Sequence, residues 1–132
     1  MPGKTILIVD DDDDVIFCVA SLLEYKGYEV VAVHDGDLAF HQIAQSKPDL
    51  IILDVMMPHM NGFDVCRTLK LGNSTMSIPV IILTALHTGN EAQEAAAAGA
   101  DCYMSKPFNN KTLIAKIEEL LHEIIPQATQ DK

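Results

Sequence analysis

Short, unbroken apolar runs alternate along this chain with segments in which apolar residues recur every three or four positions. Residues 6–9 form the first such run. In the next segment Val15, Val19 and Leu23 fall at helical spacing, and Gly27 follows as a residue that commonly ends a helix. The pattern predicts a buried strand followed by an amphipathic helix.

The same pair of patterns recurs along the rest of the chain. We expect further strands at residues 28–33, 50–53, 80–83 and 103–104, and further helices at residues 38–46, 63–70, 91–98 and, with an apolar stripe from Leu113 to Ile124, up to Pro126. Alternating strands and helices predict an α/β fold of parallel β-α-β units with right-handed crossovers and helices on both faces of the sheet. The strands lack polar alternation, which indicates that both of their faces are buried.

Composition limits the classes of protein that remain possible. A chain of 132 residues with 48% hydrophobic content predicts one domain, which we place at residues 1–126 with a polar tail at 127–132. Nine Lys and Arg against 19 Asp and Glu give a formal charge of -10, which opposes binding to nucleic-acid phosphates. We therefore expect no direct nucleic-acid binding. Because no apolar run is long enough to span a bilayer, we expect no membrane segment either.

Cysteine and histidine give no sign of a metal framework. Cys18, Cys66 and Cys102 lack C-x-x-C spacing, which is typical of a reduced, cytoplasmic protein in which cysteines are small core or half-buried residues. The five histidines match no metal-binding spacing, and we expect them to be ordinary loop or surface residues.

Aspartates gather where two of the expected strands end. Asp10 begins a run of five aspartates directly after the first strand, and Asp54 ends the third. Neighbouring parallel strands lie about 4.8 Å apart, so Asp10, Asp11 and Asp54 are expected to crowd together. Two like charges at 4 Å repel by roughly 4 kcal/mol at an effective dielectric near 20, so the cluster predicts a hard divalent cation. Residues 12–14 have a simpler interpretation, as caps and favourable charges at the start of the first helix.

Two further polar residues follow strands at the same edge. Thr84 comes after the fourth strand and Lys106 after the fifth. Taken singly, the first fits a turn and the second a solvated surface charge. Mg²⁺, however, prefers a few carboxylate oxygens together with phosphate oxygens, and a hydroxyl and an ammonium can bind further phosphoryl oxygens. The set therefore predicts a site where a phosphoryl group meets Mg²⁺ and an aspartate nucleophile.

Five segments together resemble one family. They are ILIVDDD at 6–12, LDVMMPHMNG at 53–62, ILTA at 82–85, GAD at 99–101 and YMSKPF at 103–108. In this order and spacing they resemble the receiver domain of a two-component response regulator over residues 4–124. The resemblance implies a flavodoxin-like, doubly wound sheet of five parallel strands in the order 2-1-3-4-5 with five helices.

The resemblance also assigns roles to the acidic residues. It implies that Asp54 accepts a phosphoryl group from a sensor histidine kinase or a phosphotransfer protein. It further implies that Asp11 and Asp54 bind Mg²⁺ directly, that Asp10 acts through water, and that the backbone carbonyl of Met56 completes the protein ligands. On this view the domain is a phosphoacceptor that promotes its own phosphorylation and dephosphorylation, rather than an enzyme acting on a separate substrate.

The remaining implied roles concern switching. Lys106 would pair with Asp54 or its phosphate, Thr84 would hydrogen-bond a phosphoryl oxygen, and Tyr103 would be a switch aromatic that follows the movement of Thr84. Tyr103 also fits an ordinary packed position on an edge strand. The resemblance implies a cis Lys106-Pro107 bond, and a responsive surface on the fourth helix, fifth strand and fifth helix that binds an effector protein or domain. It is compatible with a monomer or a weak, activation-dependent dimer.

Three other functions remain to be separated from this one. A haloacid dehalogenase-type phosphohydrolase would use Asp10 as nucleophile with Thr84 and Lys106, but leaves Asp54 unexplained. A flavodoxin-like nucleotide binder shares the fold, yet aspartates after the first strand would repel a cofactor phosphate. A phosphate-independent adaptor on the same fold is disfavoured by the complete set Asp11, Asp54, Thr84 and Lys106.

Overall fold

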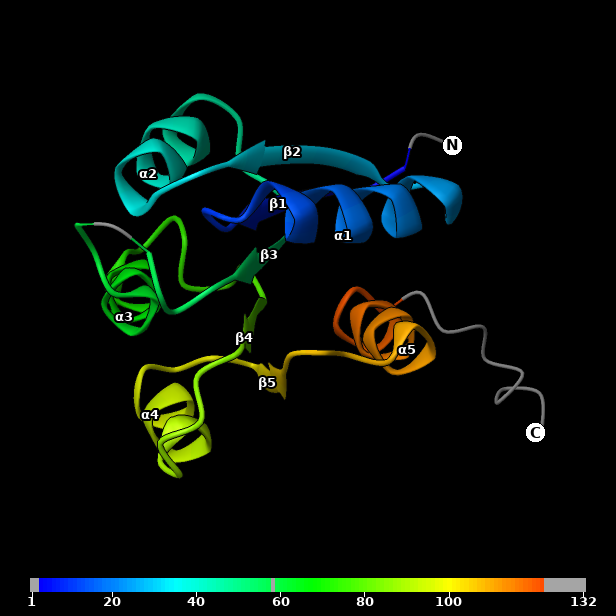
Figure 1. Cartoon of the computed structure of the whole chain (residues 1–132). Helices are drawn as coiled ribbons and strands as arrows, with labels where there is room; N and C mark the ends of the chain where they lie inside the picture. The colour runs from blue at the N-terminus through cyan, green and yellow to red at the C-terminus, as the bar shows by residue number, and fades with distance from the viewer. Residues whose placement is uncertain (1–2, 58, 123–132) are drawn as a thin grey trace, which may run out of the picture.

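A parallel sheet of five strands in the order β2-β1-β3-β4-β5 forms the centre of the molecule (Figure 1). The computed structural model describes residues 3–57 and 59–122. The strands are β1 Thr5–Val9, β2 Glu29–Val33, β3 Leu50–Leu53, β4 Val80–Thr84 and β5 Cys102–Ser105. The helices are α1 Asp13–Tyr25, α2 Gly36–Gln45, α3 Gly62–Leu71, α4 Glu91–Ala97 and α5 Asn110–Leu120. The predicted class, strand order and alternation are confirmed.

Helices cover both faces of the sheet, with α2, α3 and α4 on one side and α1 and α5 on the other (Figure 1). Successive strand residues alternate between the two cores: Leu7 and Val9 pack toward α2, α3 and α4, whereas Ile6 and Ile8 pack toward α1 and α5. All four are at most 1% exposed. The prediction of strands buried on both faces is confirmed for β1, β3 and β4, while β2 and β5 at the sheet edges are partly exposed.

Short polar side chains fix where the helices begin. Asp12 accepts hydrogen bonds from the backbone N–H groups of Asp14 and Val15, which confirms its capping role. Asp35 accepts from Leu38 N at 2.8 Å, so α2 begins at Gly36, two residues before its first apolar position. The predicted start of this helix was therefore late, because the apolar pattern does not register a cap.

Predictions about single residue types had mixed outcomes. The five histidines are all exposed, as expected. Cys66 is buried and Cys102 is partly buried, but Cys18 is exposed, so its predicted place in the core was wrong. No helix in the part of the chain that the structure describes has the length and apolar character needed to cross a membrane. The expected end of the last helix at Pro126 and the tail at residues 127–132 lie outside the described residues.

An ion-pair network ties together the amino ends of β4 and β5. The Lys70 ammonium, at the end of α3, donates to Asp101 Oδ2 at 2.9 Å, to the Ile78 carbonyl at 2.7 Å and to the Met76 carbonyl at 3.3 Å. The same Asp101 oxygen accepts from Val80 N at 2.8 Å. The network lies at the opposite ends of the strands from Asp10 and Asp54.

Candidate functional site

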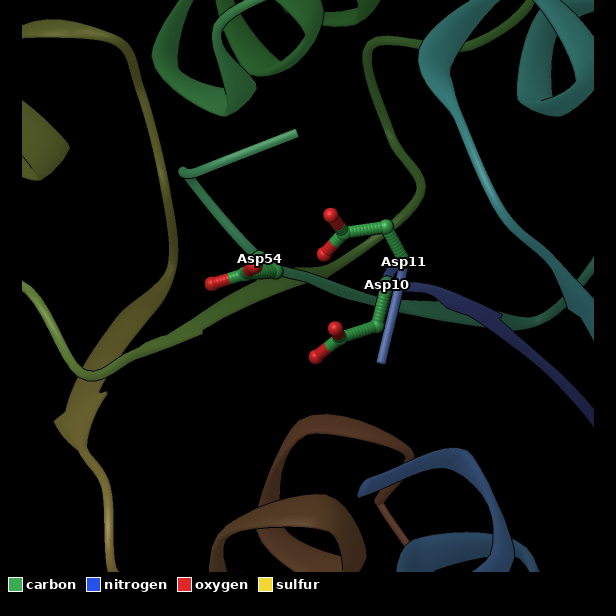
Figure 2. A group of neighbouring side chains, drawn as sticks. All are labelled: Asp10, Asp11 and Asp54. Carbon is green, nitrogen blue, oxygen red and sulfur yellow. The ribbon is translucent and has the colours of Figure 1, made fainter. Parts of the chain in front are cut away.

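The three predicted acidic residues meet at the carboxyl ends of β1 and β3. Because β1 and β3 are parallel neighbours, with Val9 paired to Leu53, the residues that follow them lie side by side. Asp54 N donates to the Val9 carbonyl at 2.9 Å, which fixes Asp54 beside the end of β1. One carboxylate oxygen each from Asp10, Asp11 and Asp54 lies within 4.8 Å of the others (Figure 2). Asp10 and Asp54 are 3% and 5% exposed, whereas Asp11 is exposed to solvent.

Lys106 supplies a positive charge to this cluster from the end of β5. Its ammonium lies 2.8 Å from Asp10 Oδ2 and 3.6 Å from Asp54 Oδ1. The expected pairing with Asp54 is therefore the longer of two contacts, since Asp10 is the closer partner. The Lys106-Pro107 bond is cis, as predicted.

Asp10 has both carboxylate oxygens engaged. Oδ1 accepts from Asp12 N at 2.9 Å, and Oδ2 accepts from the Lys106 ammonium. Both oxygens of Asp10 therefore have partners within the protein.

The environment of Asp54 disfavours its charged form. Burial of the carboxyl and the negative charge of Asp10 raise its pKa above the ordinary value. Lys106 and hydrogen bonds from the Thr84 side chain and the Val55 backbone act in the opposite direction and do not cancel the effect. Asp54 is thus a carboxylate that holds its negative charge at a cost, and a cation or an electrophile would relieve that cost.

Thr84 links Asp54 to the loop that follows β4. Its side chain is fully buried and helps to hold down the pKa of the Asp54 carboxyl, while its Oγ1 accepts from Leu86 N at 3.2 Å. Its carbonyl accepts from Lys106 N at 2.8 Å, so the threonine also fixes the backbone that carries the lysine. Tyr103 lies one strand away, half-buried against the core under α2, α3 and α4, with Ile82 of β4 as its neighbour in register.

The loop from β3 to α3 folds back on the end of β3. Met56 follows Asp54 directly after Val55, and its side chain is 57% exposed. Gly62 N donates to the Val55 carbonyl at 2.9 Å and closes the loop. A Cβ at position 62 would lie 2.1 Å from the Asp54 carbonyl oxygen, so only glycine permits this approach.

One buried charge near the site was not singled out from the sequence. Glu91, the first residue of α4, is 6% exposed. Acidic residues are common in the first turn of a helix, where they are usually solvated, so the sequence carries no signal for this burial.

Comparison with known proteins gives a consistent family. Residues 6–118 match the model of the response regulator receiver domain. The phosphate regulon transcriptional regulatory protein PhoB of Pseudomonas aeruginosa is 39% identical over 126 residues, covering 96% of this chain and 55% of that protein. Response regulator MprA of Mycobacterium avium is 39% identical over 122 residues, covering 92% of this chain and 53% of that protein.

A solved structure shares the whole fold. A putative response regulator from Chloroflexus aurantiacus superposes with a TM-score of 0.87 at 33% identity, covering 91% of this chain and 98% of that one. The chain spans about half the length of the curated relatives it matches. By its matching family model and these relatives, the chain belongs to the response regulator receiver domains, the phosphoaccepting signalling switches of two-component systems.

Proposed function

We propose that Asp54 accepts a phosphoryl group from the phosphohistidine of a histidine kinase or phosphotransfer protein, and that its loading alters a surface that binds a partner. The observation that supports this most directly is the convergence at Asp54. Two other carboxylates share its pocket, and one ammonium lies 3.6 Å from its Oδ1. Such an arrangement suits a nucleophile that must meet a highly charged group.

The residues present fit a magnesium ion. Three carboxylates offer oxygen atoms within 4.8 Å of one another, and hard oxygen ligands are those that Mg²⁺ prefers. Asp11 and Asp54 would hold the ion directly, Asp10 through water, and the backbone carbonyl of Met56 would complete the protein ligands. When bound, the ion would neutralise the crowded carboxylates and the oxygens of an incoming phosphoryl group.

The chain would supply the nucleophile of the transfer and two groups that bind the phosphoryl oxygens. An Asp54 carboxylate oxygen attacks phosphorus and forms an O–P bond as the N–P bond of the phosphohistidine breaks, and the departing imidazole keeps the electron pair. The raised pKa of Asp54 makes its carboxylate the more basic nucleophile. Lys106 and Thr84 then bind phosphoryl oxygens as a point charge and a hydroxyl donor.

Switching would begin at Thr84. Its hydroxyl group serves both Asp54 and Leu86 N, so turning toward a phosphoryl oxygen changes the hydrogen bonding of the loop after β4. We propose that this movement reaches Tyr103 and the surface of α4, β5 and α5, which would bind an effector protein or domain. A monomeric or weakly dimerising state and a cytoplasmic location stay predictions.

Phosphoryl labelling tests the proposal. Incubation with phosphoramidate and Mg²⁺ should place an acid-stable, base-labile phosphate on Asp54, detected by mass spectrometry of the intact protein and its peptides. Asp54→Asn should remove the label, while Asp10→Asn should retain part of it and Asp64→Asn, on the exposed face of α3, should label as the native protein does. Labelling lost in Asp10→Asn but kept in Asp54→Asn would instead support the phosphohydrolase alternative.

The protein's own contribution to the chemistry can be measured in the same assay. We propose that the domain promotes both its phosphorylation and its dephosphorylation. The folded protein should therefore label, and later lose its label, faster than the urea-unfolded chain. Equal rates in the two states would contradict this part of the proposal.

A further inference from the structure

Four polar or charged residues are buried in the part of the chain that the structure describes: Asp10, Asp54, Thr84 and Glu91. The first three belong to the site described above. Glu91 is the exception, because it touches none of the acidic cluster and has no part in the proposed phosphoryl transfer. A buried carboxylate is costly unless it is hydrogen-bonded or paired, so its partners indicate what it is for.

The partners of Glu91 are backbone groups of the loop between β4 and α4. Its two carboxylate oxygens accept from Thr88 N and, at 3.1 Å, from Gly89 N. These hydrogen bonds lower the pKa of the carboxyl to about 2, so the group is ionised at every pH at which the protein would work. Gly89 has φ +95, a conformation that turns the loop back toward the helix. Glu91 thus closes the loop onto the first turn of α4.

The other end of this loop is attached to the site. The Thr84 side chain acts on the Asp54 carboxyl, whose pKa it holds down, and its Oγ1 accepts from Leu86 N. The loop is therefore tied at one end to Thr84, through Leu86 N, and at the other end to Glu91, through Thr88 N and Gly89 N. The distance along the chain is only seven positions, from 84 to 91.

Glu91 is also within electrostatic reach of Tyr103. Burial, together with the negative charge of Glu91, raises the pKa of the Tyr103 hydroxyl. The loop and the first turn of α4 share one carboxylate, and α4 contacts β5, the strand that carries the tyrosine. Because the loop is hydrogen-bonded to this carboxylate, a displacement of the loop would also displace Glu91 and the start of α4.

We propose that Glu91 is a positioning residue that joins the loop after β4 to α4, so that movement of Thr84 toward a loaded Asp54 reaches α4 and Tyr103 as one displacement. The inference rests on the proposed function of Asp54 and adds the residue that transmits its state. Glu91 carries no part of the transfer chemistry, so its loss separates the two.

The chain offers a direct probe of this coupling. It has three tyrosines and no tryptophan, so incorporation of 3-fluorotyrosine gives three fluorine resonances, of which Tyr103→Phe assigns the one that matters. Beryllofluoride with Mg²⁺ serves as a stable stand-in for the phosphoryl group on Asp54. In the native protein the Tyr103 resonance should shift on loading.

Removing the carboxylate should reduce this response while sparing the chemistry. In Glu91→Ala the loading-induced shift of Tyr103 should fall at least about twofold, whereas the initial rate of labelling by phosphoramidate stays within about threefold of the native rate. Glu91→Gln keeps one amide oxygen that can accept from the loop, and should give a shift between those of the native protein and Glu91→Ala. Glu94→Ala, an exposed glutamate on the same helix, is the matched control and should respond as the native protein does.

Each failure has a distinct meaning. A native Tyr103 response in folded Glu91→Ala, or an equal loss in Glu94→Ala, overturns the inference. Loss of labelling together with loss of the shift also overturns it, because Glu91 would then support the site itself. If circular dichroism shows that Glu91→Ala does not fold, the comparison of Glu91→Gln with Glu94→Gln decides by the same criteria. Absence of labelling in the native protein would contradict the proposed function instead.

Discussion

The two ends of the sheet treat charge in opposite ways. At the amino ends of β4 and β5, the Lys70 ammonium meets one carboxylate and two carbonyls, and Asp101 has a second donor in Val80 N. At the carboxyl ends of β1 and β3, three carboxylates lie together, and the Lys106 ammonium contacts two of them, Asp10 and Asp54. The first arrangement is complete within the protein, whereas the second has an excess of negative charge. The difference teaches that one end of the fold serves stability and the other is poised for a ligand.

The largest expected effect is stabilisation by magnesium at the carboxyl ends of β1 and β3, where negative charge is in excess. At a free concentration one hundred times its dissociation constant, Mg²⁺ should raise the free energy of unfolding by about 2.7 kcal/mol, because it binds only the folded state. Urea unfolding monitored by circular dichroism, with the dissociation constant from calorimetry, measures this increment. Asp11→Asn should lose most of it at the same magnesium concentration, and Lys70→Met should retain it. An undiminished increment in Asp11→Asn would contradict the proposed metal ligands.

At the amino ends of β4 and β5, removal of Lys70 should lower the free energy of unfolding. Lys70→Met leaves the Asp101 carboxylate without its cation and two carbonyls without their donor. Because Asp101 is partly exposed, solvent reduces the cost, and we expect a loss of about 2 kcal/mol of unfolding free energy. Lys116→Met, which removes only an i,i+3 pair with Glu119, should cost about 0.5 kcal/mol or less in the same urea titration. Equal losses in Lys70→Met and Lys116→Met would show that the Lys70 network contributes no more than an exposed ion pair.

Removing a charge from the crowded end should have the opposite sign. Without magnesium, Asp54→Asn should raise the free energy of unfolding at neutral pH, because burial and the charge of Asp10 raise the pKa of Asp54 and so disfavour its ionised form in the folded state. Asp64→Asn, which breaks an exposed pair with Arg67, is the control and should bring no gain.

The pH dependence of that gain follows from the direction of the shift. The folded state takes up the Asp54 proton at a higher pH than the unfolded chain, whose ordinary pKa is 3.8. The carboxyl therefore favours folding below this value, and the benefit is lost as pH rises through the raised pKa of the folded state. The advantage of Asp54→Asn should accordingly shrink as the solution is acidified. An advantage that stays constant or grows toward low pH would count against the raised pKa.

Much of the fold and the membership of the site could be predicted because they follow from periodicity. Strands without polar alternation are expected to be buried on both faces, as β1, β3 and β4 are. Residues that follow neighbouring parallel strands lie at one edge of the sheet, which is why Asp10 and Asp54 could be placed together. The cap at Asp35 was missed because it lies outside the apolar pattern. Cys18 was misplaced because its residue type, rather than its position on the helix surface, guided the prediction.

Other features of the site depend on side-chain geometry that a sequence does not specify. The closer contact of Lys106 with Asp10 than with Asp54 follows from the path of the long lysine side chain between two nearby carboxylates. The burial of Glu91 follows from how the loop before α4 turns back on it. Neither feature can be predicted from the spacing of apolar and polar residues along the chain.

Gly62 sets a limit on how the surroundings of Asp54 can vary. Any side chain there would meet the main chain of Asp54 and Val55, and backbone atoms cannot rotate aside as the tip of a flexible side chain can. In a library randomised at this position, only glycine should survive selection for a responsive protein, whereas the exposed Met56 should admit many replacements. The mutational tolerance of the loop is thus set by its one position without a side chain.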